Sequence, residues 1–313
     1  MNKRETVLSV LHDSTPPAYI PAAFFIHFDP SCHVGQAAID KHLEFFHHTG
    51  MDFVKVQYEN PFPYRPQIAK PTDWAQMPRY GRDFYAGQLH VIDGLVKAAG
   101  KEAPVIVTVY SPFMCAGHTV GSQALNAQIA EDPQAVKKGM EIITESLMIF
   151  VKACIELGVD GFYASTQGNE SFRFADPTLF QACVKPYDLA LMHAMDRACP
   201  FNILHICDYH GGYADWNPFL DYPGHVVNCS PTLGMETRSM QEIADFFARP
   251  YMGGIERKGV IASGTPQDVA GLVTGLLEHA PARYFLGADC TLPNDVNWDN
   301  IRTAIDVAHR LGQ

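Results

Sequence analysis

Basic residues are scarce in this chain, and their scarcity excludes several classes of protein. The 313 residues include 23 Lys and Arg against 34 Asp and Glu, which gives a formal net charge of −11. Nucleic-acid binding depends on clustered positive charge, so this composition argues against a nucleic-acid partner. It argues less strongly against a polyanionic substrate, because a local basic pocket is compatible with an acidic chain.

Long apolar runs and a secretory leader are also missing. No stretch approaches the ~18 unbroken apolar residues that a membrane span requires, and the first eleven residues carry Lys3, Arg4 and Glu5. We therefore expect a cytoplasmic protein with no membrane partner. In such a chain eight cysteines do not predict a disulfide framework. They are expected to be packing residues, metal ligands or reactive thiols.

Short apolar runs alternate along the chain with longer helical patterns. The runs are Ala22–Phe28, Phe53–Tyr58, Val105–Tyr110, Gly161–Ser165, Asn202–Cys207, His225–Cys229, Tyr251–Ile255 and Tyr284–Cys290. The helical patterns are Ala37–His48, Phe84–Ala99, Pro133–Leu157, Pro177–Ala198, Ser239–Ala248, Pro266–His279 and Trp298–Leu311. Runs without polar alternation are typical of buried parallel strands.

This alternation predicts an α/β fold, a single (β/α)8 TIM barrel over residues 1–313 with a short N-terminal helix at Glu5–Asp13. A doubly wound sheet is the alternative, but no G-x-G-x-x-G follows the first run. In a barrel the active site lies at the carboxyl ends of the strands. Polar residues there give two catalytic candidates, His27 and Glu170. The substrate-binding candidates are Tyr58, Glu59, Asn169, Asn228 and Glu256.

The fifth run ends in His205-Ile206-Cys207, and its two polar residues are two positions apart. On a strand they point to the same side, so they can chelate a metal together. Cys229 ends the sixth run and Cys290 ends the eighth. Soft sulfur and nitrogen ligands favour zinc, and three protein ligands would leave a position open. Taken singly, each of these residues is explained by core packing, so the residue pattern alone leaves packing and a metal site open.

Several segments resemble the signatures of the uroporphyrinogen decarboxylase superfamily. Leu204-His205-Ile206-Cys207 is similar to its "LHICG" motif, and Leu286–Cys290 followed by Pro293 and Asn300 is similar to its C-terminal motif. Glu131-Asp132-Pro133, Gly158–Gly161 and Gly264-Thr265-Pro266 also fit. The resemblance covers the chain from about residue 130 to the end well and the first third weakly. It implies a (β/α)8 barrel.

The resemblance points to the zinc-dependent methyltransferase branch of this superfamily. That branch requires a histidine, a cysteine two residues later and a cysteine at the end of the last strand, which map onto His205, Cys207 and Cys290. It implies zinc as cofactor, a small-molecule thiol as acceptor, and a methylated corrinoid, carried by a partner protein, as donor. Cys229 stands where related cobalamin-independent methionine synthases place a glutamate ligand, so it is expected to be a fourth ligand or a neighbour.

Two departures qualify the resemblance. The decarboxylase branch carries Arg-x-x-x-Arg after the first strand, whereas residues 27–33 contain no arginine, and Glu59-Asn60 replace its pyrrole-orienting aspartate. The methyltransferase motif has a glycine where Asp208 follows Cys207. One alternative function is therefore a metal-free decarboxylase or lyase for a smaller carboxylate, with His27, Tyr58 and Glu59 as acid–base groups. Another is a non-catalytic protein that holds zinc and binds a thiol or corrinoid.

Overall fold

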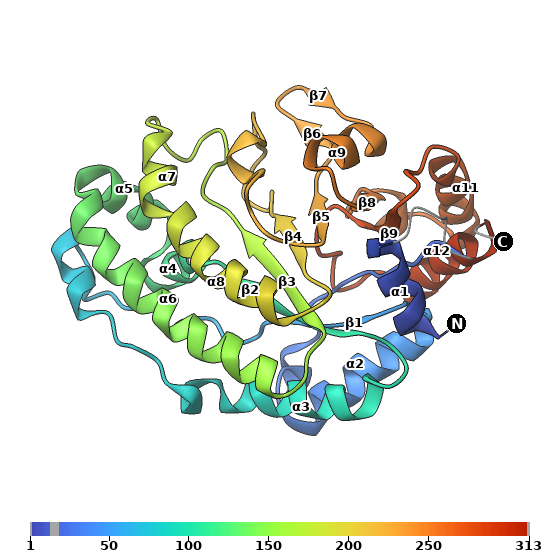
Figure 1. Cartoon of the computed structure of the whole chain (residues 1–313), viewed down its shortest axis with the longest axis horizontal. Helices are drawn as coiled ribbons and strands as arrows, with labels where there is room; N and C mark the ends of the chain where they lie inside the picture. Colours follow the sequence, from blue (N-terminus) through green and yellow to red (C-terminus); the bar gives the residue numbers. More distant parts are fainter. Residues whose placement is uncertain (1, 13–18, 312–313) are drawn as a thin grey trace.

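A curled sheet of seven parallel strands forms the centre of the computed structural model, which describes residues 2–12 and 19–311 (Figure 1). Its strand order is β1-β2-β3-β4-β5-β8-β9. The strands are β1 Val54–Val56, β2 Val105–Tyr110, β3 Gly161–Thr166, β4 Ile203–Ile206, β5 Val226–Cys229, β8 Tyr251–Ile255 and β9 Tyr284–Ala288. Each lies within a run that the sequence predicts to be a strand, except that β3 extends one residue beyond its run, to Thr166. The fold is TIM-barrel-like.

The first predicted strand, Ala22–Phe28, is the exception. It forms a single parallel bridge, Ala22 with Leu286 of β9, rather than a strand. Its backbone still bonds to both neighbours: Ala23 N donates to Leu286 O (3.1 Å) and Asp52 N donates to Ala22 O (2.9 Å). Pro21 has no N–H, so the ladder cannot extend toward the N-terminus. The segment therefore lies extended between β9 and β1 without meeting the definition of a strand.

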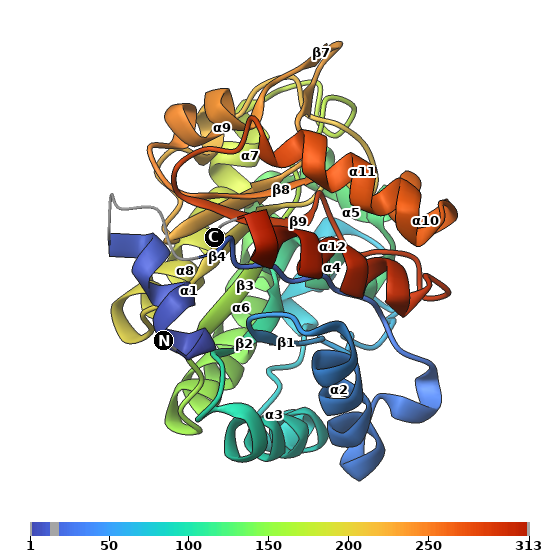
Figure 2. The same cartoon turned by 90° about the vertical axis from the view of Figure 1, so that its right-hand side faces the viewer.

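Helices wrap the outer face of the sheet (Figures 1 and 2). The longer ones are α2 Gly35–Thr49, α3 Ala86–Ala99, α6 Pro133–Glu156, α8 Lys185–Ala198, α9 Met240–Phe247, α11 Pro266–Leu277 and α12 Trp298–Leu311. Shorter ones are α4 Pro112–Val120, α5 Ser122–Glu131, α7 Thr178–Cys183 and α10 Val260–Ser263. The described part of the chain contains no helix long and apolar enough to cross a membrane.

Local residue choices explain where these helices begin and break. Thr265 caps the start of α11, because its hydroxyl oxygen accepts a hydrogen bond from Asp268 N (3.3 Å). In turn, the Asp268 carboxylate accepts a hydrogen bond from Thr265 N (2.9 Å). The predicted helix Pro177–Ala198 is instead two helices that meet at Val184. Pro186 cannot donate to the carbonyl of Ala182, so one helix cannot run through it.

The N-terminal helix α1, Lys3–His12, overlaps the predicted Glu5–Asp13, although Asp13 lies outside the described residues. Lys3 Nζ donates to Gly50 O (2.7 Å), and Arg4 forms an ion pair with Asp160. Because residues 50 and 160 precede β1 and β3, α1 covers the amino ends of the strands. The opposite end carries an unpredicted hairpin, β6 Thr232–Leu233 and β7 Glu236–Thr237, which rises away from the body (Figure 2).

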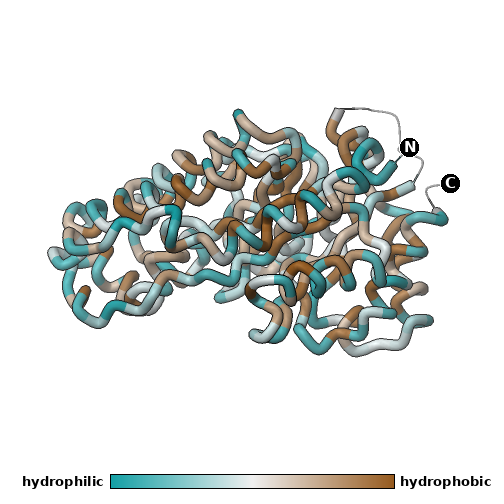
Figure 3. Tube along the Cα trace, turned by 90° about the horizontal axis from the view of Figure 1, so that it is seen from below, coloured by the Kyte–Doolittle hydropathy of each residue, from teal (hydrophilic) through white to brown (hydrophobic). Residues whose placement is uncertain are grey.

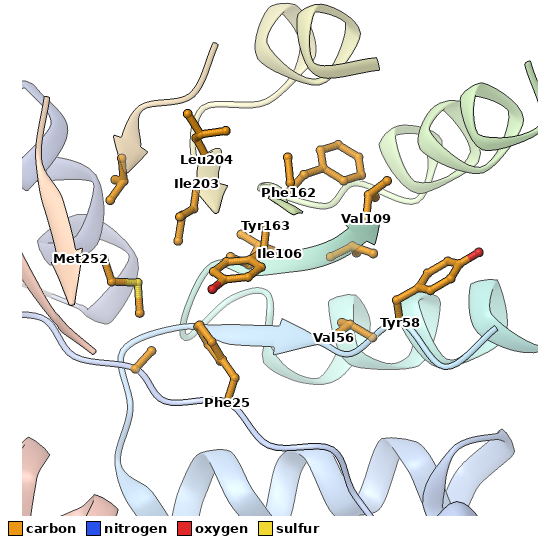
Figure 4. Close-up of a cluster of buried hydrophobic side chains, with 14 of the residues drawn as sticks. Phe25, Val56, Tyr58, Ile106, Val109, Phe162, Tyr163, Ile203, Leu204 and Met252 are labelled. Carbon is orange, nitrogen blue, oxygen red and sulfur yellow. The ribbon is translucent and has the colours of Figure 1, made fainter. Parts of the chain in front are cut away.

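Apolar side chains fill the space inside the curled sheet. Phe25, Tyr163, Ile203 and Met252 gather there, whereas Phe162 and Leu204 point away from it toward the helices (Figure 4). Figure 3 shows the hydrophobic stretches of the chain concentrated toward the middle of the molecule. The interior is therefore a packed core up to Tyr163, and a functional site can form only above it, at the carboxyl ends of the strands.

Candidate metal centre

Three predicted ligands meet above the core. His205 lies on β4, Cys207 directly follows this strand, and Cys290 lies just beyond the end of β9. All are buried, and one donor atom from each lies within 4.8 Å of the others. Cys290 Sγ is 3.5 Å from His205 Nε2. Among the described residues this is the one group of histidine, cysteine or carboxylate side chains close enough to hold a metal ion.

The state of these side chains fits a metal ligand set. The His205 ring stacks on Tyr163, with centroids 4.8 Å apart, and its Nε2 faces sulfur. His205 Nδ1 is buried and has no hydrogen-bond partner within the described residues. One imidazole nitrogen and two sulfurs form the donor set that zinc prefers, and three protein donors leave a fourth position for a substrate.

The two cysteines differ in their affinity for a proton. The hydrogen bond from Cys290 lowers the pKa of Cys207, and further bonds from Tyr209 N and from Gln167 Nε2 (3.3 Å) act in the same direction. That same bond, together with burial, raises the pKa of Cys290. The thiolate is the form that binds a metal, and these hydrogen bonds make it easier to form at Cys207 than at Cys290.

A cavity of about 820 Å³ opens beside the three ligands. Its opposite wall comes from β1 and β2 and presents Lys55, Gln57 and Thr108. Ser165 and Gln167, from β3 and its end, line the cavity beside the ligands. Among the described residues no Asp or Glu lines this cavity, although the whole chain contains 34 of them. The cavity is also lined by basic and histidine side chains, namely Lys55, Lys258, Arg257, His27, His118 and His210. The pocket is therefore far less acidic than the protein as a whole.

Lys55 is a cavity residue that the sequence did not single out. It is 6% exposed, and its Nζ lies 4.3 Å from the ring centroid of Phe25 and 4.7 Å from that of Tyr163. Burial lowers its pKa to about 7, an effect that the negative charge of Glu59 partly opposes. Within the described residues it has no ion-pair partner at 4.0 Å or less. A lysine between two valines of a buried strand was the available signal.

Of the other predicted site residues, His27 lines the cavity. Its Nδ1 bonds to Glu59 Oε1 (2.9 Å), and Gln57 Nε2 contacts its Nε2 (2.8 Å). Glu59 lies behind His27 and also faces His33 Nδ1 at 3.6 Å. Glu59 therefore orients His27 and does not itself line the cavity.

The remaining predicted residues do not reach the cavity. Glu170 forms a fully buried ion pair with Arg173 and accepts from Gly168 N (2.7 Å), so it fixes the loop after β3. Asn228 lies beneath the site and donates to Met252 O and Ala288 O. Tyr58 packs on Phe150 of α6. Asn169 is half-buried and Glu256 is exposed, both outside the cavity lining.

Cys229 is not brought to the three ligands. It pairs in register with Ile206, whereas its neighbour Asn228 pairs with His205. Successive side chains of a strand alternate between faces, so Asn228 shares the inner face with His205 and Cys229 takes the outer one. Burial raises the pKa of Cys229, as expected for a thiol in the core. All eight cysteines are free.

Solved structures share this architecture. A methyltransferase from Methanosarcina mazei superposes with a TM-score of 0.76 at 14% identity, covering 99% of both chains. A B12-independent methionine synthase from Shewanella sp. W3-18-1 superposes with a TM-score of 0.56 at 12% identity, covering 95% of this chain and 94% of that one. At these identities the similarity concerns the fold alone.

Sequence comparison identifies the family. The chain is 22% identical over 182 residues to the methylcobamide:CoM methyltransferases MtbA of Methanosarcina acetivorans and Methanosarcina mazei. Each match spans 58% of this chain and about half, 51%, of the relative. The family model described as uroporphyrinogen decarboxylase (URO-D) matches residues 45–311, as the motifs around His205 and Cys290 predicted. The chain belongs to the uroporphyrinogen decarboxylase (URO-D) family.

Proposed function

We propose that this protein is a zinc-dependent methyltransferase that moves a methyl group from a methylated corrinoid, or another methyl donor, to a thiol. The observation that carries the proposal is the buried group of His205, Cys207 and Cys290, whose donor atoms lie within 4.8 Å of one another beside a large cavity. Zinc held there would act as a Lewis acid and lower the pKa of a thiol at its open position. We place this activity in one (β/α)8 domain, residues 1–313, in the cytoplasm.

In the proposed reaction the substrate sulfur forms a bond to the methyl carbon. The bond from that carbon to the donor breaks, and its electron pair stays with the donor. The thiol proton leaves first, and we assign its uptake to Nε2 of His27, which lines the cavity and must part from Gln57 Nε2 (2.8 Å) to accept it. Glu59 accepts from His27 Nδ1 (2.9 Å), which fixes the orientation of the ring. His27 is thus the proposed proton acceptor, while Glu170 holds a loop.

The wall opposite the ligands supports a thiol that carries an anionic group. Lys55 is buried without an ion-pair partner in the described residues, and Thr108 Oγ1 is buried and unpartnered. No carboxylate lines the cavity to repel an anion. The MtbA relatives carry methylcobamide and CoM in their names, and by analogy we propose a corrinoid on a partner protein as the donor. The partner would approach the open mouth of the cavity, and neither nucleic acid nor membrane is involved.

A second candidate is a metal-free lyase acting on a small carboxylate. The pairing of His27 with Glu59 at the cavity wall, facing the same space as Lys55, favours it. Tyr58, its third expected acid–base group, lies outside the cavity lining. Metal content separates the two functions, because the lyase would contain no stoichiometric zinc.

The experiment is zinc quantification on purified protein together with a methyl-transfer assay. We expect about one zinc per chain and thiol-dependent demethylation of methylcobalamin. Cys32→Ser is the matched control, since Cys32 is only partly buried and lies outside the cavity. It should retain both properties. Full zinc retention in the double variant Cys207→Ser, Cys290→Ser would contradict the proposal, and zinc without transfer to any thiol would favour a binding protein.

A further inference from the structure

Each of the two ligand cysteines has a carboxylate beside it in the chain. Asp208 follows Cys207, and Asp289 precedes Cys290. The side chain of Arg257, from the loop after β8, lies between them. Its Nη1 is 2.7 Å from Asp208 Oδ1 and 3.4 Å from Asp289 Oδ2. Arg257 N also donates to Asp289 Oδ1 (3.0 Å). We call these three residues the Asp–Arg–Asp bridge.

The two cysteines come from strands that are not neighbours in the sheet. Cys207 follows β4 and Cys290 follows β9, and β5 and β8 stand between these strands. Neighbouring strands lie about 4.8 Å apart, so three steps amount to roughly 14 Å along the sheet. The sulfurs nevertheless lie within 4.8 Å of each other. The sheet is curled, so side chains that point inward from both strands converge. Backbone bonds hold each segment to its own neighbour, Cys207 N to Thr166 O (3.0 Å) and Asp289 N to Ile255 O (2.9 Å), and side-chain contacts between the two segments can fix their final separation.

The Asp–Arg–Asp bridge joins these two segments directly. Its side chains are 14%, 16% and 9% exposed for Arg257, Asp208 and Asp289, so solvent screens the ion pairs only partly. One guanidinium nitrogen, Nη1, lies near both carboxylates, so a single positive group links the two segments. A glycine at position 208, usual in the motif that this segment resembles, has no side chain to form the bridge.

We propose that Arg257 is a positioning residue that, through Asp208 and Asp289, holds Cys207 and Cys290 at metal-binding separation and so sets the affinity of the site for zinc. The inference rests on the proposed function, because it assumes that these cysteines bind zinc. The inference goes beyond the proposed function, because it assigns part of the zinc affinity to residues that are not zinc ligands. Residues that support metal ligands in this way typically change affinity by ten- to a hundredfold.

The test measures zinc affinity by competition with a chromophoric chelator, starting from metal-free full-length protein. Arg257→Gln removes the positive charge from both contacts, and Arg257→Lys keeps the charge but carries it on a shorter side chain. Asp208→Asn removes one carboxylate. Arg82→Gln is the matched control, because it breaks an exposed arginine–glutamate pair, Arg82 with Glu156 at 2.6 Å, away from the cavity. Circular dichroism checks that each variant is folded.

We expect zinc affinity to fall by about ten- to a hundredfold in Arg257→Gln, by less in Asp208→Asn, and not at all in Arg82→Gln. The double variant Arg257→Gln, Asp208→Asn should lose no more than Arg257→Gln, because both changes remove one interaction. The cobalt-substituted variants should keep two thiolate ligands but show a shifted visible spectrum.

The outcomes separate this inference from the proposed function. A wild-type protein that binds no zinc would defeat the proposed function itself. Tight zinc binding by the wild type, with affinity unchanged in folded Arg257→Gln, would overturn the bridge and leave the function standing. If Arg257→Gln does not fold, Arg257→Lys and Asp208→Asn decide the question by the same criterion.

Discussion

The two sides of the cavity carry different kinds of side chain, and only one of the two sides could be predicted from the sequence. The side formed by β4 and β9 carries His205, Cys207 and Cys290, which are soft metal donors. The side formed by β1 and β2 carries Lys55, Gln57 and Thr108, which offer positive charge and hydrogen bonds. One side suits the reacting sulfur and the other suits the remainder of the substrate. A change on one side should therefore leave the role of the other side intact.

The largest effect is expected on the metal side. Cys207→Ser or Cys290→Ser should lower methyl transfer by on the order of a thousandfold, because losing the Lewis acid removes several kcal/mol of stabilisation. A steady-state assay at saturating thiol measures this. Binding of a thiol-free acid should survive, since Lys55 is untouched. If such an acid no longer binds to the folded variants, the two sides do not act separately.

On the opposite side, Lys55→Met should raise the KM for an acidic thiol by roughly thirtyfold, since removing one partner of a buried charge pair costs about 2 kcal/mol or more. The zinc content should remain that of the wild type. A neutral thiol of the same length serves as the control substrate, and its KM should hardly change. An equal rise for both thiols would mean that Lys55 supports the fold and does not recognise charge.

The two faces of strand β5 provide a smaller contrast. Cys229→Ser should keep the zinc and destabilise the protein by roughly 1–3 kcal/mol, because a hydroxyl replaces a buried thiol. Denaturant unfolding measures the stability, and the sulfur-to-cobalt charge-transfer band of the cobalt form measures thiolate number. A weaker band in this variant would show that Cys229 is a ligand after all and that its outward placement is wrong.

The smallest effect concerns pH. The pKa of Lys55, lowered to about 7 by burial, leaves the side chain charged below pH 7 and increasingly neutral above it. The charged form binds an anion, so affinity of the metal-free protein for a thiol-free acid should decline as pH rises, by about tenfold from pH 6 to pH 8. Calorimetric titration at several pH values checks this. Lys55→Met should show a weaker pH dependence, and an affinity that rises with pH would contradict the assignment.

The metal ligands could be predicted from the sequence because their spacing and their places at the ends of strands can be read from short segments. His205 and Cys207 are two positions apart on a strand, so they share a face whatever the register. Cys290 ends the last apolar run, and parallel strands finish at one end of the barrel. Seven strands were predicted for the same reason. The eighth predicted strand, Ala22–Phe28, forms only a single bridge, because Pro21 limits the ladder in a way that a run of apolar residues does not reveal.

The predictions that were wrong or missing concern residues whose position depends on contacts with segments far away in the sequence. Because side chains alternate between the two faces of a strand, either Asn228 or Cys229 faces inward. Only the register with β4 shows that it is Asn228. Glu170 follows a strand end as a catalytic residue would, yet Arg173 three residues later neutralises it in the core. Lys55 belongs to the site only because β1 faces β4 across the cavity, and nothing in its own segment reveals that partner.

The most direct test of the central claim is X-ray absorption at the zinc edge, with and without a saturating thiol substrate. The claim is that His205, Cys207 and Cys290 hold the metal and leave one position for the substrate sulfur. The account predicts two sulfur neighbours without the thiol and three with it, alongside one imidazole nitrogen. A sulfur count that stays at two while the thiol is bound and methylated would contradict it.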